Sequence, residues 1–231
     1  HLISLPSQII IMKYIQLDNF LSPTIFKRLQ LMTGGENGFP WYFLSKDVAY
    51  ATDGYQFGNM DILDIAPEQK TVGFTHVLLD QGGIESPWLV HFQPLLDCMQ
   101  DAIGHDINFL RVRLALQLAN GKDSHNAAHT DWENDHYAAL FYLNNSSGDT
   151  VFFDQYDDPN EGTVDERWYR GRTQEYTERH RVTPEENKLF IFDGHQYHSS
   201  SNPVDNPYRI ICNFNFTCDH DIFDHQQTQI L

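Results

Sequence analysis

Residues 109–118 and 208–217 alternate apolar and polar side chains with a period of two, and this pattern constrains the fold more than any other feature. The first segment reads FLRVRLALQL, with aliphatic residues on one face and arginine or glutamine on the other. Such a period fits a strand and does not fit an amphipathic helix. Because the polar faces carry arginine and asparagine, the two strands predict a barrel or jelly roll with helices outside and a hydrated interior.

The rest of the chain contains boundary signals for helices and further strands. Two helices are predicted at residues 22–34 and 86–104, where apolar positions recur at helical spacing after a Ser-Pro pair. We expect Gly34 to end the first helix in a left-handed conformation, and Pro94 to kink or restart the second. Three more strands are predicted at residues 137–143, 150–154 and 188–193.

The length of 231 residues predicts one domain, because all-β barrels and sandwiches often reach about 200–250 residues. The expected fold class is mainly β (α+β), a jelly roll with supporting N-terminal helices. A polar insertion interrupts it, and we consider both a solvated surface segment and a substrate-contacting lid. Residues 1–11 are expected to be a truncation remnant. The expected parts are 1–107 for N-terminal strands and helices, 108–217 for the core, about 155–181 for the insertion and 218–231 for a tail.

The charge and the cysteines exclude several classes of partner. A net charge of −17 argues against nucleic acid, because a polyanion binds to a basic surface. No apolar run approaches the roughly 20 residues that span a bilayer, so no membrane partner is expected. Three cysteines without a CxxC pair fit a reducing compartment, so we expect a cytoplasmic protein of a bacterial or viral host cell. The sequence leaves the oligomeric state open.

Residues 129–131 read His-Thr-Asp in a turn between two predicted strands. With 12 histidines and 22 aspartates in the chain, about one His-x-Asp is expected by chance, so only the context gives the motif meaning. A second histidine-rich turn, with His195 and His198, follows another apolar strand, and Arg209 lies on the polar face of the last strand. Two imidazoles and one carboxylate leave three octahedral positions open, which is the arrangement of non-haem Fe(II) oxygen chemistry.

The chain resembles the 2-oxoglutarate and Fe(II)-dependent dioxygenases, in particular their prolyl 4-hydroxylase-like branch. The resemblance implies a double-stranded β-helix (jelly roll) and hydroxylation of an aliphatic C–H. It implies Fe(II), 2-oxoglutarate and O₂ as cofactor and co-substrates, with ascorbate supporting activity. The segments that carry it are HTD at 129–131, ALFYLN at 139–144, GDTVFF at 148–153, VTPEENKLFIF at 182–192, HSSSNPV at 198–204 and YRIICNF at 208–214.

The resemblance also implies roles for individual residues. His129, Asp131 and His198 would be the iron ligands, with His198 favoured over His195 because the residues after it match the family. No catalytic residue beyond these ligands is implied. Arg209 would bind the distal carboxylate of 2-oxoglutarate, with help from Tyr142 and, by a weaker correspondence, Asn213. Tyr142 as an ordinary core tyrosine stays an alternative.

The substrate is less well defined by the sequence. The resemblance implies a prolyl or other residue of a peptide or protein, with a small molecule second. Arg111, Arg113 and Trp132 are candidate substrate contacts, although pairing with acidic residues would explain the arginines equally well. Ten acidic residues against two arginines within 131–170 suggest an acidic rim and a neutral or cationic substrate.

Two other classes of function remain open on the sequence. A jelly roll that only binds a partner or serves a structural role would keep the fold without turnover. A cupin-type metalloenzyme of another reaction class would bind metal without affinity for 2-oxoglutarate.

Overall fold

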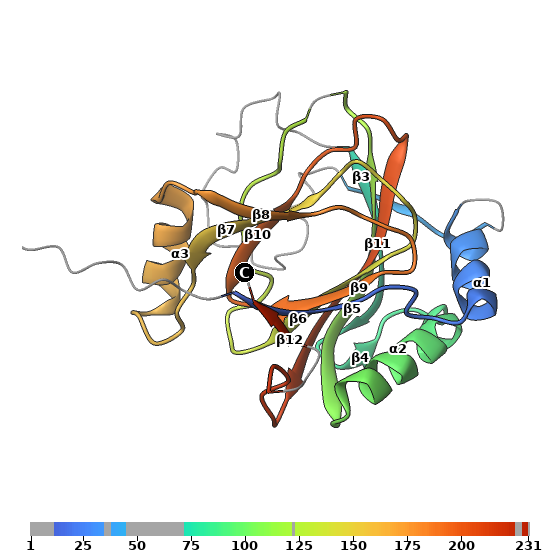
Figure 1. Cartoon of the computed structure of the whole chain (residues 1–231), viewed down its shortest axis with the longest axis horizontal. Coiled ribbons are helices and arrows are strands. Elements are labelled where there is room, and N and C mark those ends of the chain that lie inside the picture. The colour runs from blue at the N-terminus through green and yellow to red at the C-terminus, as the bar shows by residue number, and fades with distance from the viewer. Residues whose placement is uncertain (1–11, 35–37, 45–71, 122, 225–227, 231) are drawn as a thin grey trace, which may run out of the picture.

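Two antiparallel sheets form the body of the protein in its computed structural model (Figure 1). The structure describes residues 12–34, 38–44, 72–121, 123–224 and 228–230, so the predicted remnant at 1–11 lies outside it. The strands of the larger sheet are β1 (Lys13–Leu17), β2 (Tyr42–Leu44), β3 (Gly73–Asp80), β4 (Gly83–Ile84), β5 (Ile107–Leu118), β6 (Tyr137–Tyr142), β9 (Leu189–Asp193), β11 (Tyr208–Cys218) and β12 (Thr228–Ile230). The strands of the smaller sheet are β7 (Thr150–Tyr156), β8 (Glu178–Val182) and β10 (Gln196–Ser200).

The order of the strands brings distant parts of the sequence together. The larger sheet runs β12-β1-β9-β6-β11-β5-β3-β2, with β4 beside β3, and the smaller sheet runs β10-β7-β8. Between them lies an apolar cluster that includes Tyr142, Phe152 and Phe190. The predicted mainly β class is therefore confirmed, as are all five strands predicted in the second half of the chain.

Strands β5 and β11 lie side by side in the middle of the larger sheet. Their register pairs Arg209 with Gln117 and Asn213 with Arg113. The polar side chains of this face are buried inside the protein, whereas the aliphatic face packs against the two N-terminal helices. The alternation in the sequence thus predicted both faces correctly.

Helices α1 (Pro23–Thr33) and α2 (Leu89–Ile103) cover the outer face of the larger sheet (Figure 1). Gly34 ends α1 as predicted, but with φ of −72° rather than in the left-handed region, whereas Gly104 ends α2 at φ of 76°. The expectation that Pro94 restarts the second helix is wrong, because α2 continues through it. The carbonyl group that loses its helical partner at Pro94 belongs to Val90, which is exposed and can bind water.

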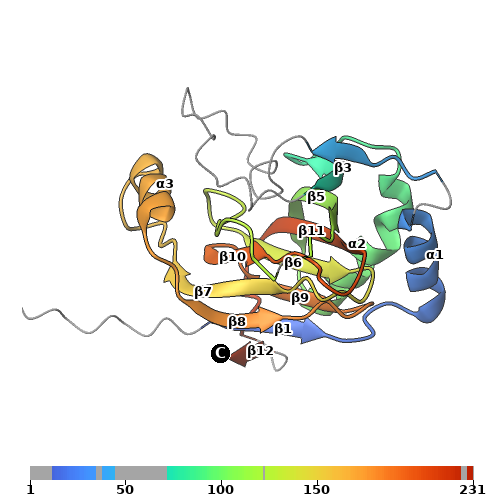
Figure 2. The same cartoon turned by 90° about the horizontal axis from the view of Figure 1, so that it is seen from above.

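One helix and several strands were not predicted at specific residues. Strands β1 to β4 lie in the part where strands were expected without stated bounds, and β12 lies in the expected tail. Strand β8 and helix α3 (Val164–Thr173) lie in the polar insertion, and β10 contains the segment expected to be a turn. Figures 1 and 2 both show α3 beside β7, at the end of the molecule away from α1 and α2. A signal for α3 was present, because Thr163 and Glu166 form a reciprocal capping box with T-x-x-E spacing.

The acidic and arginine-rich halves of the insertion region pair with each other. Asp154 Oδ1 lies 2.8 Å from Arg179 Nε, and Asp157 Oδ2 lies 3.1 Å from Arg167 Nη1. These two ion pairs join the acidic part of the region to its arginine-rich part.

Within the described part of the chain, no helix is both long and apolar enough to cross a membrane.

Candidate metal centre and co-substrate pocket

The two histidines of the proposed metal site face each other across a short backbone bridge. The N–H of His129 donates to the carbonyl of His198 at 2.9 Å, and the N–H of His198 donates to the carbonyl of His129 at 3.0 Å. His129 lies in the loop after β5, whereas His198 lies within β10 and not in the turn that we predicted. The bridge fixes the spacing of the two side chains before any metal binds.

Each of the two imidazoles is oriented by a backbone carbonyl. His129 Nδ1 lies 3.0 Å from the carbonyl oxygen of Ala127, and His198 Nδ1 lies 3.0 Å from that of Gln196. A carbonyl oxygen can only accept, so Nδ1 is the protonated nitrogen in both rings. The lone pair of each Nε2 is therefore available for a metal ion.

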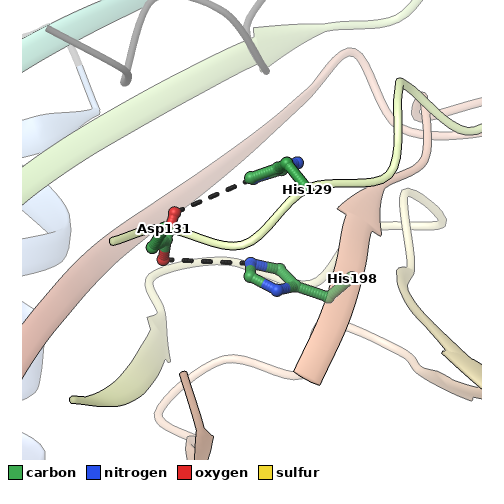
Figure 3. A group of neighbouring side chains, drawn as sticks. All are labelled: His129, Asp131 and His198. Carbon is green, nitrogen blue, oxygen red and sulfur yellow. Dashed lines mark ion pairs between the residues drawn. The ribbon is translucent and has the colours of Figure 1, made fainter. Parts of the chain in front are cut away.

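Asp131 completes the group (Figure 3). Its Oδ1 lies 3.7 Å from His129 Nε2, and its Oδ2 lies 3.8 Å from His198 Nε2. The ligand atoms of the three residues all lie within 4.8 Å of one another. Among the described residues, no other group of at least three His, Cys, Asp or Glu side chains meets this condition.

The two oxygens of Asp131 have different surroundings. Oδ2 accepts hydrogen bonds from the side-chain amides of Asn213 at 3.1 Å and Asn215 at 3.0 Å. Oδ1 accepts no hydrogen bond from the described residues and lies 3.4 Å from Arg111 Nη2. Oδ1 is therefore the oxygen left for a metal ion, and the two amides hold the carboxylate in that orientation.

The electrostatics of the site keep the carboxyl ionised and His198 neutral. Burial opposes ionisation of Asp131, yet His198, Arg111, His129 and the Asn215 hydrogen bond hold its pKa well below the ordinary value. Among these groups, Arg111 is the one whose charge is permanent. Burial lowers the pKa of His198 to about 4. An ionised carboxylate and a neutral imidazole are the protonation states in which these groups can bind a metal ion.

The buried histidines predict a loss of stability in acid. Burial lowers the pKa of both His198 and His136 to about 4, whereas unfolded histidine titrates near about 6.5. Between these values the unfolded chain binds protons that the folded chain excludes, so the free energy of unfolding falls as the pH falls. The loss is about 3 kcal/mol for each group. Urea unfolding of metal-free protein from pH 7 to pH 4 measures it.

A matched variant tests this origin. In His136→Gln about half of the acid-dependent loss should disappear. The pKa of His195 is raised despite its burial, because Asp157, Asp193 and Asp135 surround it. His195 therefore changes the free energy of unfolding with pH in the opposite sense and offsets part of the loss. A wild-type stability that stays constant between pH 6.5 and pH 4 would contradict the assignment.

A second polar cluster surrounds Arg209, whose side chain is buried on β11. Arg209 Nη2 donates to Thr150 Oγ1 at 2.7 Å, and the Tyr142 hydroxyl lies 2.9 Å from the same oxygen. Arg209 Nε donates to no acceptor among the described residues, although it is buried. Such an orphaned guanidinium donor fits a carboxylate bound in the cavity. Burial lowers the pKa of Arg209, but the group stays charged at neutral pH.

One cavity connects the two clusters. His129 and His198 line it together with Arg209 and Thr150. Tyr142 is buried as the core interpretation required, and its hydroxyl also contacts this pocket through Thr150. The two histidines assigned to the metal and the arginine assigned to the distal carboxylate thus line one cavity.

For three residues of the site, the surroundings in the structure add to the prediction from the sequence or were not predicted. Asn213 was expected to bind 2-oxoglutarate; it lines the cavity, and its amide group also donates to Asp131. Asn215 and Thr150 were not singled out. Asn215 continues the polar face of the last strand, so the alternation contained a signal for it. The sequence contains no signal for Thr150 beyond its position at the start of a predicted strand.

The candidate substrate contacts lie close to the metal group, but not all in one place. Arg111 Nε donates to Asn215 Oδ1 at 3.0 Å, and its guanidinium carbon lies 5.6 Å from the centroid of the Trp132 ring. Arg113 is buried and lines the cavity beside His129 and His198. Arg111 is therefore engaged with the candidate ligand Asp131, whereas Arg113 lines the cavity.

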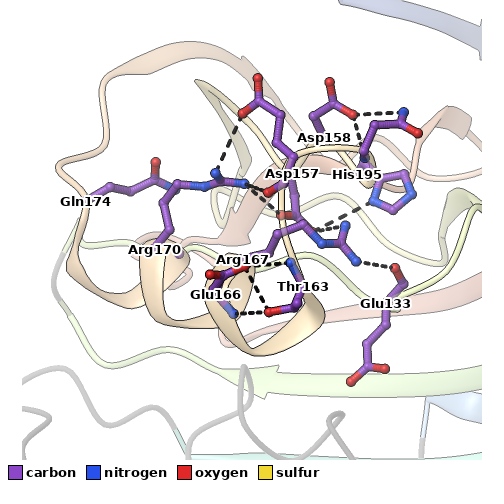
Figure 4. A network of polar contacts seen from close by, with 12 residues as sticks. Glu133, Asp157, Asp158, Thr163, Glu166, Arg167, Arg170, Gln174 and His195 are labelled. Carbon is purple, nitrogen blue, oxygen red and sulfur yellow. Dashed lines mark hydrogen bonds and ion pairs between the residues drawn. The ribbon is translucent and has the colours of Figure 1, made fainter.

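His195 lies in a separate network and is not part of the metal group (Figure 4). Its Nε2 lies 3.1 Å from Asp135 Oδ1, and its Nδ1 lies 3.9 Å from Asp157 Oδ2. Asp157 also pairs with Arg167 of α3, whose other terminal nitrogen donates to the carbonyl of Glu133 at 3.0 Å. This network connects the insertion to the loop that contains Asp131.

Comparison with solved structures identifies the fold. A 2OG-Fe(II) oxygenase family oxidoreductase from Burkholderia pseudomallei aligns with a TM-score of 0.53 at 11% identity, covering 90% of this chain and 86% of that one. HygX from Streptomyces hygroscopicus, with nickel and 2-oxoglutarate bound, gives 0.51 at 11% identity, with 89% and 83% covered. A prolyl hydroxylase from Trichoplax adhaerens, in complex with a hypoxia inducible factor peptide fragment, gives 0.51 at 13%, with 88% and 83% covered.

These similarities concern structure and not sequence. No protein-family model matches the chain, and no curated protein matches it either. The chain has the jelly-roll fold of the 2-oxoglutarate and Fe(II)-dependent oxygenases, as its sequence resemblance implied.

Proposed function

We propose that the protein is a 2-oxoglutarate- and Fe(II)-dependent dioxygenase that hydroxylates an aliphatic C–H bond. The observation that carries the proposal is the cavity that has His129 and His198 at one end and Arg209 with Thr150 at the other. An imidazole pair beside a carboxylate suits Fe(II), and a buried guanidinium with an orphaned donor suits the far carboxylate of a dicarboxylic 2-oxo acid.

The residues of the site would have two separate roles, metal binding and co-substrate binding. His129, His198 and Asp131 Oδ1 would hold the metal, and Arg209 would bind and orient the co-substrate with help from Thr150 and Tyr142. The bound iron and 2-oxoglutarate supply the oxidation of the C–H bond by O₂, with release of succinate and CO₂. The apolar cluster between the sheets excludes water from beneath the site.

We propose a prolyl or other residue of a peptide as the first substrate class, and a small molecule as the second. A solved prolyl hydroxylase of the same fold was determined in complex with a peptide fragment, which supports this order. The alternatives are a jelly roll without turnover and a cupin-type metalloenzyme. The polar residues at the two ends of the cavity favour the oxygenase over these two alternatives.

An anaerobic titration separates these classes. Fe(II)-loaded protein should develop a weak visible charge-transfer band when 2-oxoglutarate is added, and the band should weaken in Arg209→Ala. A cupin of another class would bind Fe(II) without the band, and a binding module would show no succinate release with any substrate. Aerobic incubation with Fe(II), ascorbate and a peptide library should then give succinate together with a peptide that has gained one oxygen atom.

The Thr150 hydroxyl group provides a sharper test of the co-substrate end. Thr150→Val keeps the shape of the side chain but removes the oxygen that Arg209 and Tyr142 share. We expect the affinity for 2-oxoglutarate to fall about tenfold, because a hydrogen bond to a charged group contributes about 1.5 kcal/mol or more. Isothermal titration of Ni(II)-loaded protein measures this.

Thr33→Val is the matched control for that variant. It removes a buried hydroxyl that bonds to the Leu29 carbonyl within α1, outside the cavity. Equal 2-oxoglutarate affinities for the two variants would argue against Thr150 as part of the pocket.

A further inference from the structure

Two asparagines of β11 hold the same oxygen of Asp131, but they differ in the surroundings of their own amide oxygens. Asn213 and Asn215 both donate to Asp131 Oδ2, at 3.1 Å and 3.0 Å. Asn215 Oδ1 accepts a hydrogen bond from Arg111 Nε at 3.0 Å. Asn213 Oδ1 accepts none from the described residues, although this residue is only 4% exposed. Asn213 therefore has a buried acceptor that the proposed oxygenase mechanism does not use.

The orientation of the Asn213 amide is fixed by Asp131. An ionised carboxylate can only accept hydrogen bonds, so the NH₂ group of Asn213 must be the end that faces Asp131. Turning the amide over would bring two oxygen atoms together. Arg113 lies opposite Asn213 on β5, but it does not donate to Asn213 Oδ1. The unused acceptor is thus a consequence of the carboxylate beside it.

Asn213 also belongs to the lining of the cavity. It lies there together with His129 and His198, whereas Asn215 is not among the lining residues. Since its NH₂ group is engaged with Asp131, the oxygen is the atom that Asn213 has left for a ligand. A buried acceptor without a donor is unfavourable, so a ligand that brings a donor should bind here more tightly than one that does not.

We propose that Asn213 is a substrate-binding residue, whose amide oxygen accepts a hydrogen bond from an N–H or O–H group of the substrate. The inference rests on the proposed function, because it takes the metal ion and the 2-oxo acid as given. Ionised 2-oxoglutarate does not supply the donor, since its carboxylates and its keto group can only accept. O₂ has no hydrogen atom to donate. The substrate is the remaining ligand of the proposed reaction, and water, the competing donor, would not distinguish between the two probes used below.

This contact narrows the proposed substrate class. A peptide supplies the donor from a backbone N–H group, and a small molecule supplies it from a hydroxyl or amide group. A prolyl residue has no backbone N–H. If a prolyl residue is hydroxylated, the donor must therefore come from a neighbouring residue of the peptide, whereas any other residue can use its own N–H.

A pair of matched amides tests the contact before the substrate is identified. N-methylacetamide has one N–H group, whereas N,N-dimethylacetamide has the same carbonyl group and no N–H. Each is added to Mn(II)-loaded protein with saturating 2-oxoglutarate, and the paramagnetic relaxation of its methyl protons reports binding beside the metal. We expect wild-type protein to relax N-methylacetamide about threefold or more faster than N,N-dimethylacetamide at equal concentration.

Two matched variants separate ligand binding from support of Asp131. Leucine has the branched shape of asparagine but no polar side-chain atom, so Asn213→Leu and Asn215→Leu each remove one hydrogen bond from Asp131. Both should weaken Mn(II) binding, and the measurement is therefore made at saturating Mn(II). Asn213→Leu should abolish the preference for N-methylacetamide, whereas Asn215→Leu should keep it. A residue that only positions Asp131 would not produce this difference.

Asn213→Asp covers the risk that Asn213→Leu does not fold. Two carboxyl groups in contact share one proton, so the new side chain can donate to Asp131 with one oxygen and keep the other for the ligand. The preference for N-methylacetamide should therefore survive in this variant. The proposal is overturned if wild-type protein relaxes both amides equally, or if Asn213→Leu lowers the preference no more than Asn215→Leu does. Failure of wild-type protein to bind 2-oxoglutarate in calorimetry would instead overturn the proposed function.

Discussion

Asp131→Asn should abolish metal binding although it changes a single oxygen to a nitrogen. Asn213 and Asn215 both donate to Oδ2, and only an oxygen can accept from them. The one carbonyl oxygen of the new asparagine must therefore take that place. Its NH₂ group is then turned toward His129, where it cannot bind a metal ion. We expect the affinity for Ni(II) to fall by more than the roughly 10- to 100-fold that loss of an outer-shell partner costs.

The same loop offers a matched control for Asp131→Asn. Asp135 is four residues further along, but its side chain is 88% exposed and pairs with His195. Asp135→Asn should leave the Ni(II) affinity unchanged in isothermal titration. The variant at Asp131 should also be less stable, since Arg111 is left buried without its carboxylate. An Asp131→Asn protein that is folded and binds Ni(II) as tightly as wild type would refute the assignment of Asp131 as a ligand.

Arg167→Ala should be among the most destabilising single changes in the insertion. Arg167 is buried and pairs with Asp157 at 3.1 Å while donating to the carbonyl of Glu133 (Figure 4). Removing the guanidinium takes the hydrogen-bond donor from the buried Asp157 carboxylate and leaves only Arg170 and His195, each 3.9 Å away. Breaking a buried ion pair in this way costs up to about 3–5 kcal/mol. The Glu133 contact is lost at the same time, two residues from Asp131, the proposed metal ligand. We expect weaker Ni(II) binding as well as a lower free energy of unfolding.

Arg170→Ala, one turn away on α3, is the control for Arg167→Ala. Its side chain is 39% exposed, and its nearest approach to Asp157 is 3.9 Å. A long contact to a partly exposed arginine contributes about 0–1 kcal/mol, so this variant should unfold in urea close to wild type. Adding Asp157→Asn to Arg167→Ala should restore part of the lost stability, because no buried charge then remains unpaired. Similar losses in Arg167→Ala and Arg170→Ala would contradict the proposed anchoring role.

Several local patterns in the sequence predicted the structure correctly. The period of two in 109–118 and 208–217 predicted which side chains face the helices and which face the interior. The helix boundaries at Pro23 and Gly104 followed from the known preferences of proline and glycine. The missed helix α3 also had a local signal, the capping box of Thr163 and Glu166.

The expectations that failed depended on neighbours that are distant in sequence. His198 was expected in a turn, but pairing with β7 makes its segment a strand. Pro94 was expected to kink or restart a helix, and the restart is wrong because α2, which packs on the sheet, is continuous through it. In both cases tertiary contacts outweighed a local preference.

The sequence alone determined the alternating strands, the His-x-Asp turn and the likeness to a family of oxygenases. The tertiary structure alone decided what surrounds each of those residues. Asn215 reaches Asp131 across 84 positions and Arg209 reaches Thr150 across 59. Such contacts depend on strand register, because a shift by one residue would turn every side chain to the opposite face. Only the folded sheets therefore show which oxygen of Asp131 is left for a metal ion and which arginine faces the cavity.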